Sequence, residues 1–112
     1  MGLAGSAVMR QAAEAEGLRF AAEAFADRAY DGAGRLIPRS RPGALITDPA
    51  SAAAKALRIV RHHVLTSVEG TEVPMHADTL CLHGDNFHVF AIARAVRETL
   101  EGAGVSVQAL AR

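Results

Sequence analysis

Tryptophan is absent from this 112-residue chain, and aromatic residues make up only 4% of it, so stacking platforms for nucleic-acid bases are not expected. Cysteine is nearly absent too. Cys81 is the only one and cannot form an internal disulfide, which is typical of a reducing compartment. Excess charge of either sign is missing, because twelve Lys and Arg balance twelve Asp and Glu. This balance excludes a strongly basic surface of the kind that binds nucleic acid or acidic lipid.

Long apolar runs are also lacking. No stretch of the sequence approaches the roughly 18 residues that a membrane helix needs. The first residues show no charged region followed by an apolar one, as a signal peptide would. What is present is ordinary for a globular domain, with 50% apolar and 21% charged residues. We therefore expect one small cytoplasmic domain that binds neither nucleic acid nor membrane.

The order of predicted elements indicates an α/β fold. Helices are expected after Ser6, from Asp48-Pro49 and after a cap at Asn86. Strands are expected at residues 18–25, 78–82 and 105–107, with an irregular stretch at 26–47 and a hairpin around Glu69-Gly70. The strand at 18–25 does not alternate strictly between apolar and polar residues, which favours a strand buried in a parallel sheet, and residues 78–82 are also typical of a buried strand.

The segment His83-Gly84-Asp85 follows a predicted strand and precedes a predicted helix. In parallel α/β folds the carboxyl ends of the strands form the ligand crevice. His83 can then serve as an acid or base near neutral pH, with Asp85 orienting it or holding a cation. The alternative is structural: Asp85 caps the helix and His83 is a hydrogen-bonded residue at a strand end.

Glu23 lies inside an otherwise apolar strand, where a carboxylate needs a partner or a purpose. An ion pair with Arg28 or Arg39 is the structural alternative. Asp27 and Arg28 follow the same strand and can either face a ligand or pair with each other.

Other polar residues give weaker signals. Arg35, Arg39 and Arg41 can hold a carboxylate or phosphate, or simply be solvated. The spacing of the histidines matches no zinc-binding pattern, so none of them is predicted to be a metal ligand. Cys81 is expected to be an inert buried thiol.

Several segments together resemble one family. Residues 23–30 (EAFADRAY) match its E-x-F-A-D-R-x-Y pattern, residues 34–40 (GRLIPRS) its G-x-L-x-P-R-S pattern, and residues 79–85 (TLCLHGD) its final C-x-H-G-D pattern. With Gly2–Ser6 and Gly43–Ile46 in the same order, the resemblance covers essentially the whole chain and points to the LamB/YcsF family, the A subunits of prokaryotic 5-oxoprolinase.

The resemblance implies a fold and an extent. The fold expected is the C-terminal portion of a distorted β/α barrel of the glycoside hydrolase/deacetylase type, with mainly parallel strands. Members are about twice this length, near the size of a barrel. Residues 1–112 are therefore expected to be a single partial domain whose N-terminal half is absent, as in a truncated or split gene.

The activity implied is ATP-dependent opening of 5-oxo-L-proline to L-glutamate, together with subunits B and C. On that reading His83 is the acid/base group and Asp85 orients it. Glu23 and Asp27 polarise substrate or water, while Arg28 and Arg39 hold anions. Two alternatives remain: a metal-dependent hydrolase or deacetylase of similar topology, and an inactive binding or assembly fragment that self-associates through an exposed strand edge.

Overall fold

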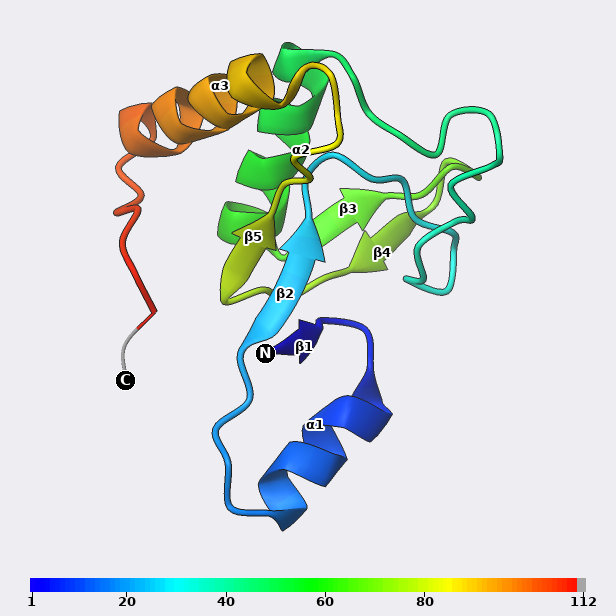
Figure 1. The fold of residues 1–112 in the computed structure, drawn as a ribbon, viewed down its shortest axis with the longest axis vertical. Coiled ribbons are helices and arrows are strands. Elements are labelled where there is room, and N and C mark those ends of the chain that lie inside the picture. Colours follow the sequence, from blue (N-terminus) through cyan, green and yellow to red (C-terminus); the bar gives the residue numbers. More distant parts are fainter. Residues whose placement is uncertain (111–112) are drawn as a thin grey trace.

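The computed structural model describes residues 1–110. A three-stranded parallel sheet lies beneath two helices, and a two-stranded hairpin lies beside it (Figure 1). The two covering helices are α2 (Pro49–His62) and α3 (Val89–Gly102), which pack against each other. None of the helices within residues 1–110 has the length and apolar character needed to span a bilayer.

The parallel sheet is built from β1 (Gly2–Leu3), β2 (Ala22–Phe25) and β5 (Thr79–Cys81), with β2 in the centre. All pairings are parallel, which confirms the predicted α/β class with parallel strands. The strand predicted at residues 18–25 forms only in its second half, because only that half has strands to pair with. Within residues 1–110 the sheet is open, so the barrel stays a prediction.

The register between β2 and β5 is held at the start of both strands by a reciprocal pair. Ala22 N donates to the Asp78 carboxylate at 2.9 Å, and Asp78 N donates to the Ala22 carbonyl at 2.8 Å. Glu23 then pairs with Thr79 along the ladder. A carboxylate that accepts a backbone N–H at a strand start fixes which residues meet further along.

Side chains of β2 and β5 alternate between two faces of the sheet. Ala24 packs with Ile59, and Ala26 packs with Ala56, so these residues face α2. The residues that alternate with them lie on the opposite face, which we call the open face: Leu3, Glu23, Phe25, Asp27, Thr79, Cys81 and His83. On the open face, Glu23, Thr79, Cys81 and His83 are only half-buried, contrary to the predicted fully buried strand at 78–82.

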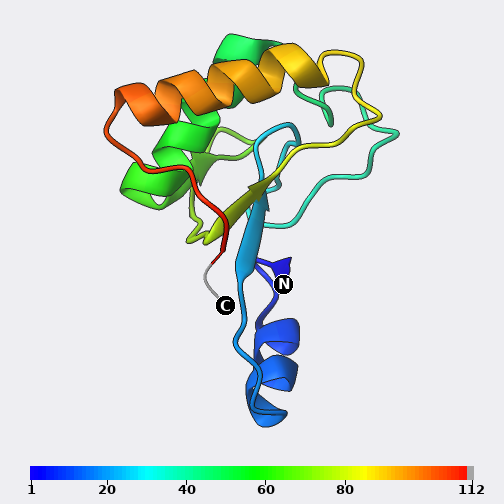
Figure 2. The same ribbon diagram turned by 60° about the vertical axis from the view of Figure 1, so that its left-hand side comes forward.

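Helix α1 (Ala7–Ala15) projects away from the body of the molecule (Figure 2). Its predicted cap is confirmed, since the Ser6 side chain accepts the Met9 N–H at 3.2 Å. Gly17 ends the helix with a left-handed φ of 72°, which glycine adopts without strain. The helix has no buried residue, so it contributes little to the core.

The predicted start of α2 and the predicted hairpin are both confirmed. Asp48 accepts the Ser51 N–H at 3.0 Å, and Pro49 occupies the first helical turn. Strands β3 (Val64–Thr66) and β4 (Glu72–Pro74) are antiparallel. Gly70, at φ 83°, allows the turn between them.

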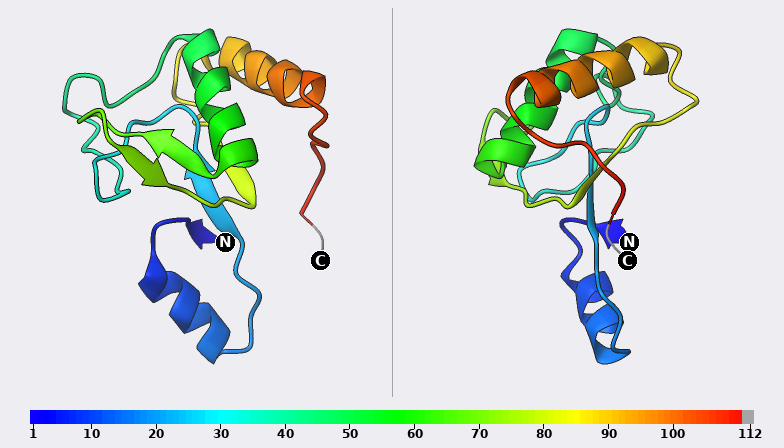
Figure 3. Two further views of the ribbon diagram at one scale, coloured as in Figure 1. Left: turned by 180° about the vertical axis from the view of Figure 1, so that it is seen from behind. Right: turned by 90° about the vertical axis from the view of Figure 1, so that its left-hand side faces the viewer.

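The start of α3 differs from prediction. His88, not Asn86, is the cap residue, and Asn86 instead accepts the His88 N–H at 2.9 Å in the preceding turn. The buried face is made of Ile92, Val96 and Leu100. The strand predicted at 105–107 does not form. The chain there runs back along the body without strand partners (Figure 3).

Candidate functional site

A buried carboxylate and an imidazole meet just beyond the carboxyl ends of β2 and β5. The carboxylate oxygens of Asp27 lie 2.9 and 3.1 Å from Nδ1 of His83. Asp27 also accepts the backbone N–H of His83 at 2.8 Å. Asp27 is only 1% exposed, whereas 22% of the His83 side chain remains accessible. Asp27 therefore holds both the ring and the backbone of His83.

The sheet brings these two residues together. Phe25 pairs with Cys81 at the ends of β2 and β5, and in each case the chain runs two residues further, to Asp27 and to His83. The Phe25 ring meets the His83 imidazole edge-on, with centroids 4.9 Å apart. The ring is thereby fixed from a second side.

The hydrogen bond to Asp27 sets the state of the imidazole. Because an ionised carboxylate only accepts hydrogen bonds, the hydrogen is assigned to Nδ1 of His83. Nε2 then carries the free lone pair and can accept or return a proton. This is the arrangement that general acid/base catalysis requires.

Asp85 does not orient His83, contrary to the prediction. Its carboxylate accepts from Arg39 at 2.6 Å, in an exposed ion pair. The Arg39 guanidinium beside it holds the pKa of Asp85 below its usual value. Register explains the difference, because Asp27 meets His83 across the β2–β5 pairing while Asp85 lies beyond it in the turn.

Arg28 lies inside the molecule rather than at a surface. It is 7% exposed, and its guanidinium donates to the Ile37 carbonyl at 2.9 Å. This contact ties the irregular stretch 26–47 to the end of β2. The predicted role in holding an anion receives no support from these contacts.

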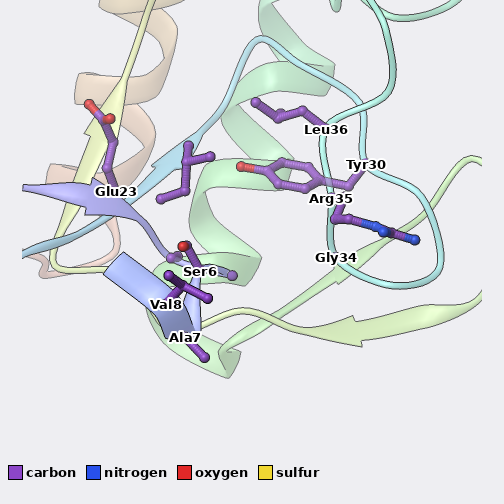
Figure 4. A pocket seen from close by; sticks show the side chains of 11 residues that line it. Ser6, Ala7, Val8, Glu23, Tyr30, Gly34, Arg35 and Leu36 are labelled. Carbon is purple, nitrogen blue, oxygen red and sulfur yellow. The ribbon is translucent and has the colours of Figure 1, made fainter. Parts of the chain in front are cut away.

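Glu23 lies at a different place on the open face. It borders a cavity of about 460 Å³ together with Tyr30 and Ser6 (Figure 4). Asp27 lies beyond the end of β2, in the turn at residues 26–27. The lining of this cavity does not include His83. The structure thus places Glu23 on the same face as the Asp27–His83 pair but not in contact with it.

Cys81 connects these two places. Burial raises the pKa of its thiol, and the negative charge of the nearby Glu23 carboxylate raises the pKa further. Asp27 adds a smaller effect in the same direction. The predicted unreactive thiol agrees with this environment. Neither Arg28 nor Arg39 is the partner of Glu23, contrary to the structural alternative.

Sequence reasoning missed two residues beside Asp27. Lys55, on α2, donates to the Arg28 carbonyl at 2.5 Å, and its ammonium lies 4.9 Å from the centre of the Tyr30 ring. The Tyr30 hydroxyl accepts the Phe25 N–H at 3.0 Å. Lys55 lies three residues after Ala52 and four before Ile59, both fully buried. That helical spacing was the available signal.

The contacts within residues 1–110 do not form a phosphate cradle for ATP. Arg35 pairs with Asp31 and Arg39 with Asp85, and Arg28 is buried against a carbonyl. In the same residues no three histidine, cysteine or acidic side chains gather as metal ligands.

The fold and the site together define an α/β protein with a carboxylate–imidazole pair at adjacent strand ends. Residues 1–112 match the LamB/YcsF family. The chain is 52% identical over 102 residues to the A subunit of 5-oxoprolinase from Thermus thermophilus, covering 91% of this chain and 41% of that protein. It is 49% identical over 108 residues to the protein of the same name from Syntrophobacter fumaroxidans, covering 96% and 42%.

A solved structure agrees. The lactam utilization protein from Thermus thermophilus superimposes with a TM-score of 0.84 at 48% identity, over 92% of this chain and 40% of that one. The chain belongs to the LamB/YcsF family. It spans about two fifths of the length of the relatives it matches.

Proposed function

We propose that this chain acts as part of a 5-oxoprolinase, in the manner of its A subunit. The reaction is the ATP-dependent hydrolysis of 5-oxo-L-proline to L-glutamate, carried out in the cytoplasm with subunits B and C. One observation carries the proposal: about half of the aligned residues are identical to those of relatives named as A subunits of 5-oxoprolinase. The Asp27–His83 pair supplies the chemical group that such a reaction needs.

Opening a lactam requires three events. Water must attack the amide carbon, the carbon–nitrogen bond must break, and the nitrogen must gain a proton before it leaves. Unactivated amides resist all three. The reaction therefore requires activation of the amide oxygen, for which ATP is used. Protonation of the nitrogen needs a group that takes a proton from water and gives it to the nitrogen.

His83 fits this role. Nε2 takes a proton from the attacking water and then donates it to the ring nitrogen, so the imidazole ends as it began. Asp27 is the positioning residue, because it keeps the hydrogen on Nδ1 and stabilises the imidazolium that forms between the two steps. Glu23 remains the proposed group for polarising substrate, and Arg39 for an anion once it leaves Asp85.

The test compares two histidines. In the Thermus relative assembled with its partner subunits, the alanine substitution corresponding to His83→Ala should lower glutamate release by about 100-fold or more. The substitution corresponding to His88→Ala is the control, because His88 lies beyond the turn and makes no contact with Asp27 through its side chain. Circular dichroism checks folding. Near-normal turnover without the first histidine would end the assignment.

A further inference from the structure

Lys55 is the only lysine among the twelve lysine and arginine residues of the chain. It is largely buried, and burial lowers the pKa of its amine to about 8, although the nearby charge of Asp27 acts in the opposite direction. A buried ammonium is costly unless something requires it. The mechanism above makes no use of it.

The backbone around Asp27 shows what Lys55 does. The Asp27 carbonyl accepts from Ile46 N at 2.9 Å, and the Ala29 carbonyl accepts from Ile37 N at 3.1 Å. Between them, the Arg28 carbonyl accepts from Lys55 Nζ at 2.5 Å. Three consecutive carbonyls are thus held, and the middle one is held by a side chain. Lys55 is the part of this arrangement that links the segment to α2.

The charge of Lys55 adds a second effect. Asp27 is a buried carboxylate, and its side-chain partner His83 brings a positive charge only when the imidazole is protonated. The Lys55 ammonium lies against the Arg28 carbonyl, one residue beyond Asp27, and over the Tyr30 ring. An opposite charge at short range stabilises an ionised carboxylate in a low-dielectric interior. The same side chain therefore fixes the backbone and compensates the charge.

We propose that Lys55 is a positioning residue for the Asp27–His83 pair: through the Arg28 carbonyl and its charge it holds Asp27 where Asp27 keeps the hydrogen on Nδ1 of His83. The role of Lys55 in turnover rests on the proposed function. The structural role does not, because it concerns the state of an imidazole in this chain. Lys55 itself touches no reacting atom.

The test reads the His83 tautomer directly by long-range ¹H–¹⁵N NMR of the imidazole, at a pH where the ring is neutral. Lys55→Met should raise the Nε2–H form of His83 several-fold, as Asp27→Asn should. Lys55→Arg keeps a charged donor and should stay close to the parent protein. Arg58→Met is the matched control on the same helix, because Arg58 contacts Thr66 and Glu72 instead. An unchanged His83 spectrum in Lys55→Met overturns the proposal.

A second measurement decides the matter if Lys55→Met does not fold. With ¹³C-labelled lysine the protein gives one side-chain lysine signal, and its titration reports Lys55 alone. Removing the charge in Asp27→Asn should lower the pKa of Lys55 below the value of about 8. An unshifted pKa contradicts the coupling.

Turnover is measured separately, in the complex of this chain with subunits B and C. Lys55→Met should lower kcat about tenfold with little change in KM, as loss of an outer positioning contact does. Should the parent protein show no lactam hydrolysis, the proposed function fails while the NMR result still stands. Should turnover be normal and the tautomer altered, the positioning role in catalysis fails.

Discussion

The thiol of Cys81 offers a residue-level probe of the open face. Its pKa is raised first by burial and then by the carboxylate of Glu23. Since the thiolate is the reactive form, we expect alkylation of Cys81 to be slow at pH 8. In Glu23→Gln the pKa should fall toward its ordinary value, and the rate of iodoacetamide alkylation at pH 8 should rise several-fold.

The control for this experiment is Asp85→Asn. Asp85 pairs with Arg39 and is not among the groups that shift the pKa of Cys81. The rate of Cys81 alkylation in Asp85→Asn should match that of the parent protein across pH 7–10. Equal rates for Glu23→Gln and the parent protein would show that the carboxylate of Glu23 does not act on the thiol.

At the same scale, the sequence indicated where site residues lie but not which of them meet. Asp27 and His83 each follow a strand, so both were predicted at one rim of the sheet. Their mutual contact depends on the register of strands 56 positions apart, which local pattern does not encode. Asp85 is near His83 in the sequence, which favours it as the predicted partner, but Asp27 is the carboxylate that contacts His83 in space.

The two capped helices differ in how closely they are coupled to the core. Asp48 begins α2, which carries buried Ala52, Ala56 and Ile59. Hydrogen bonds from Ser51 hold the pKa of Asp48 below its ordinary value of 3.8. Asp48→Ala should lower the melting temperature by a few degrees at pH 7. Because a lowered pKa stabilises the fold above the ordinary value, this difference in melting temperature should shrink as the pH falls below 3.8 and Asp48 becomes protonated.

Ser6→Ala is the matched comparison, read by differential scanning calorimetry and hydrogen exchange. It removes an equivalent cap from α1, which has no buried residue. Faster exchange within α1 is expected, with little change in the melting temperature. Equal losses in both variants would mean that α1 folds together with the core.

The elements that sequence predicted well have local signals. The Asp48-Pro49 start and the Glu69-Gly70 turn are decided by residues next to one another. The elements that failed depend on distant partners. Residues 105–107 have the composition of a strand but no strand to pair with in residues 1–110, and Asn86 can cap a helix but serves a turn one step earlier.

At the scale of the whole molecule, both outer strands of the sheet have an unpaired edge within residues 1–110. β1 and β5 pair with β2 alone, and on the open face Leu3 is exposed while Thr79 and Cys81 are half-buried. Unpaired edges pair with other chains. We expect the chain to self-associate at micromolar concentration, measured by sedimentation velocity.

Leu3→Lys tests this expectation, because Leu3 is 40% exposed on edge strand β1 and lysine discourages edge pairing. The variant should sediment at a smaller mean size than the parent protein. Val8→Lys is the control, since Val8 is also apolar and exposed but lies on α1. A monomeric parent protein with a cooperative melt would contradict the expectation.

The carboxylates of Asp78 and Asp27 stand at opposite ends of the same strand pairing, and each accepts a backbone N–H from across it. A shift of one residue between β2 and β5 would break both bonds and carry His83 to the wrong side of the sheet. A shift in the β2–β5 register therefore always removes the His83 imidazole from the site. Any molecule that has folded with these strands correctly aligned has its proton-transfer group already assembled.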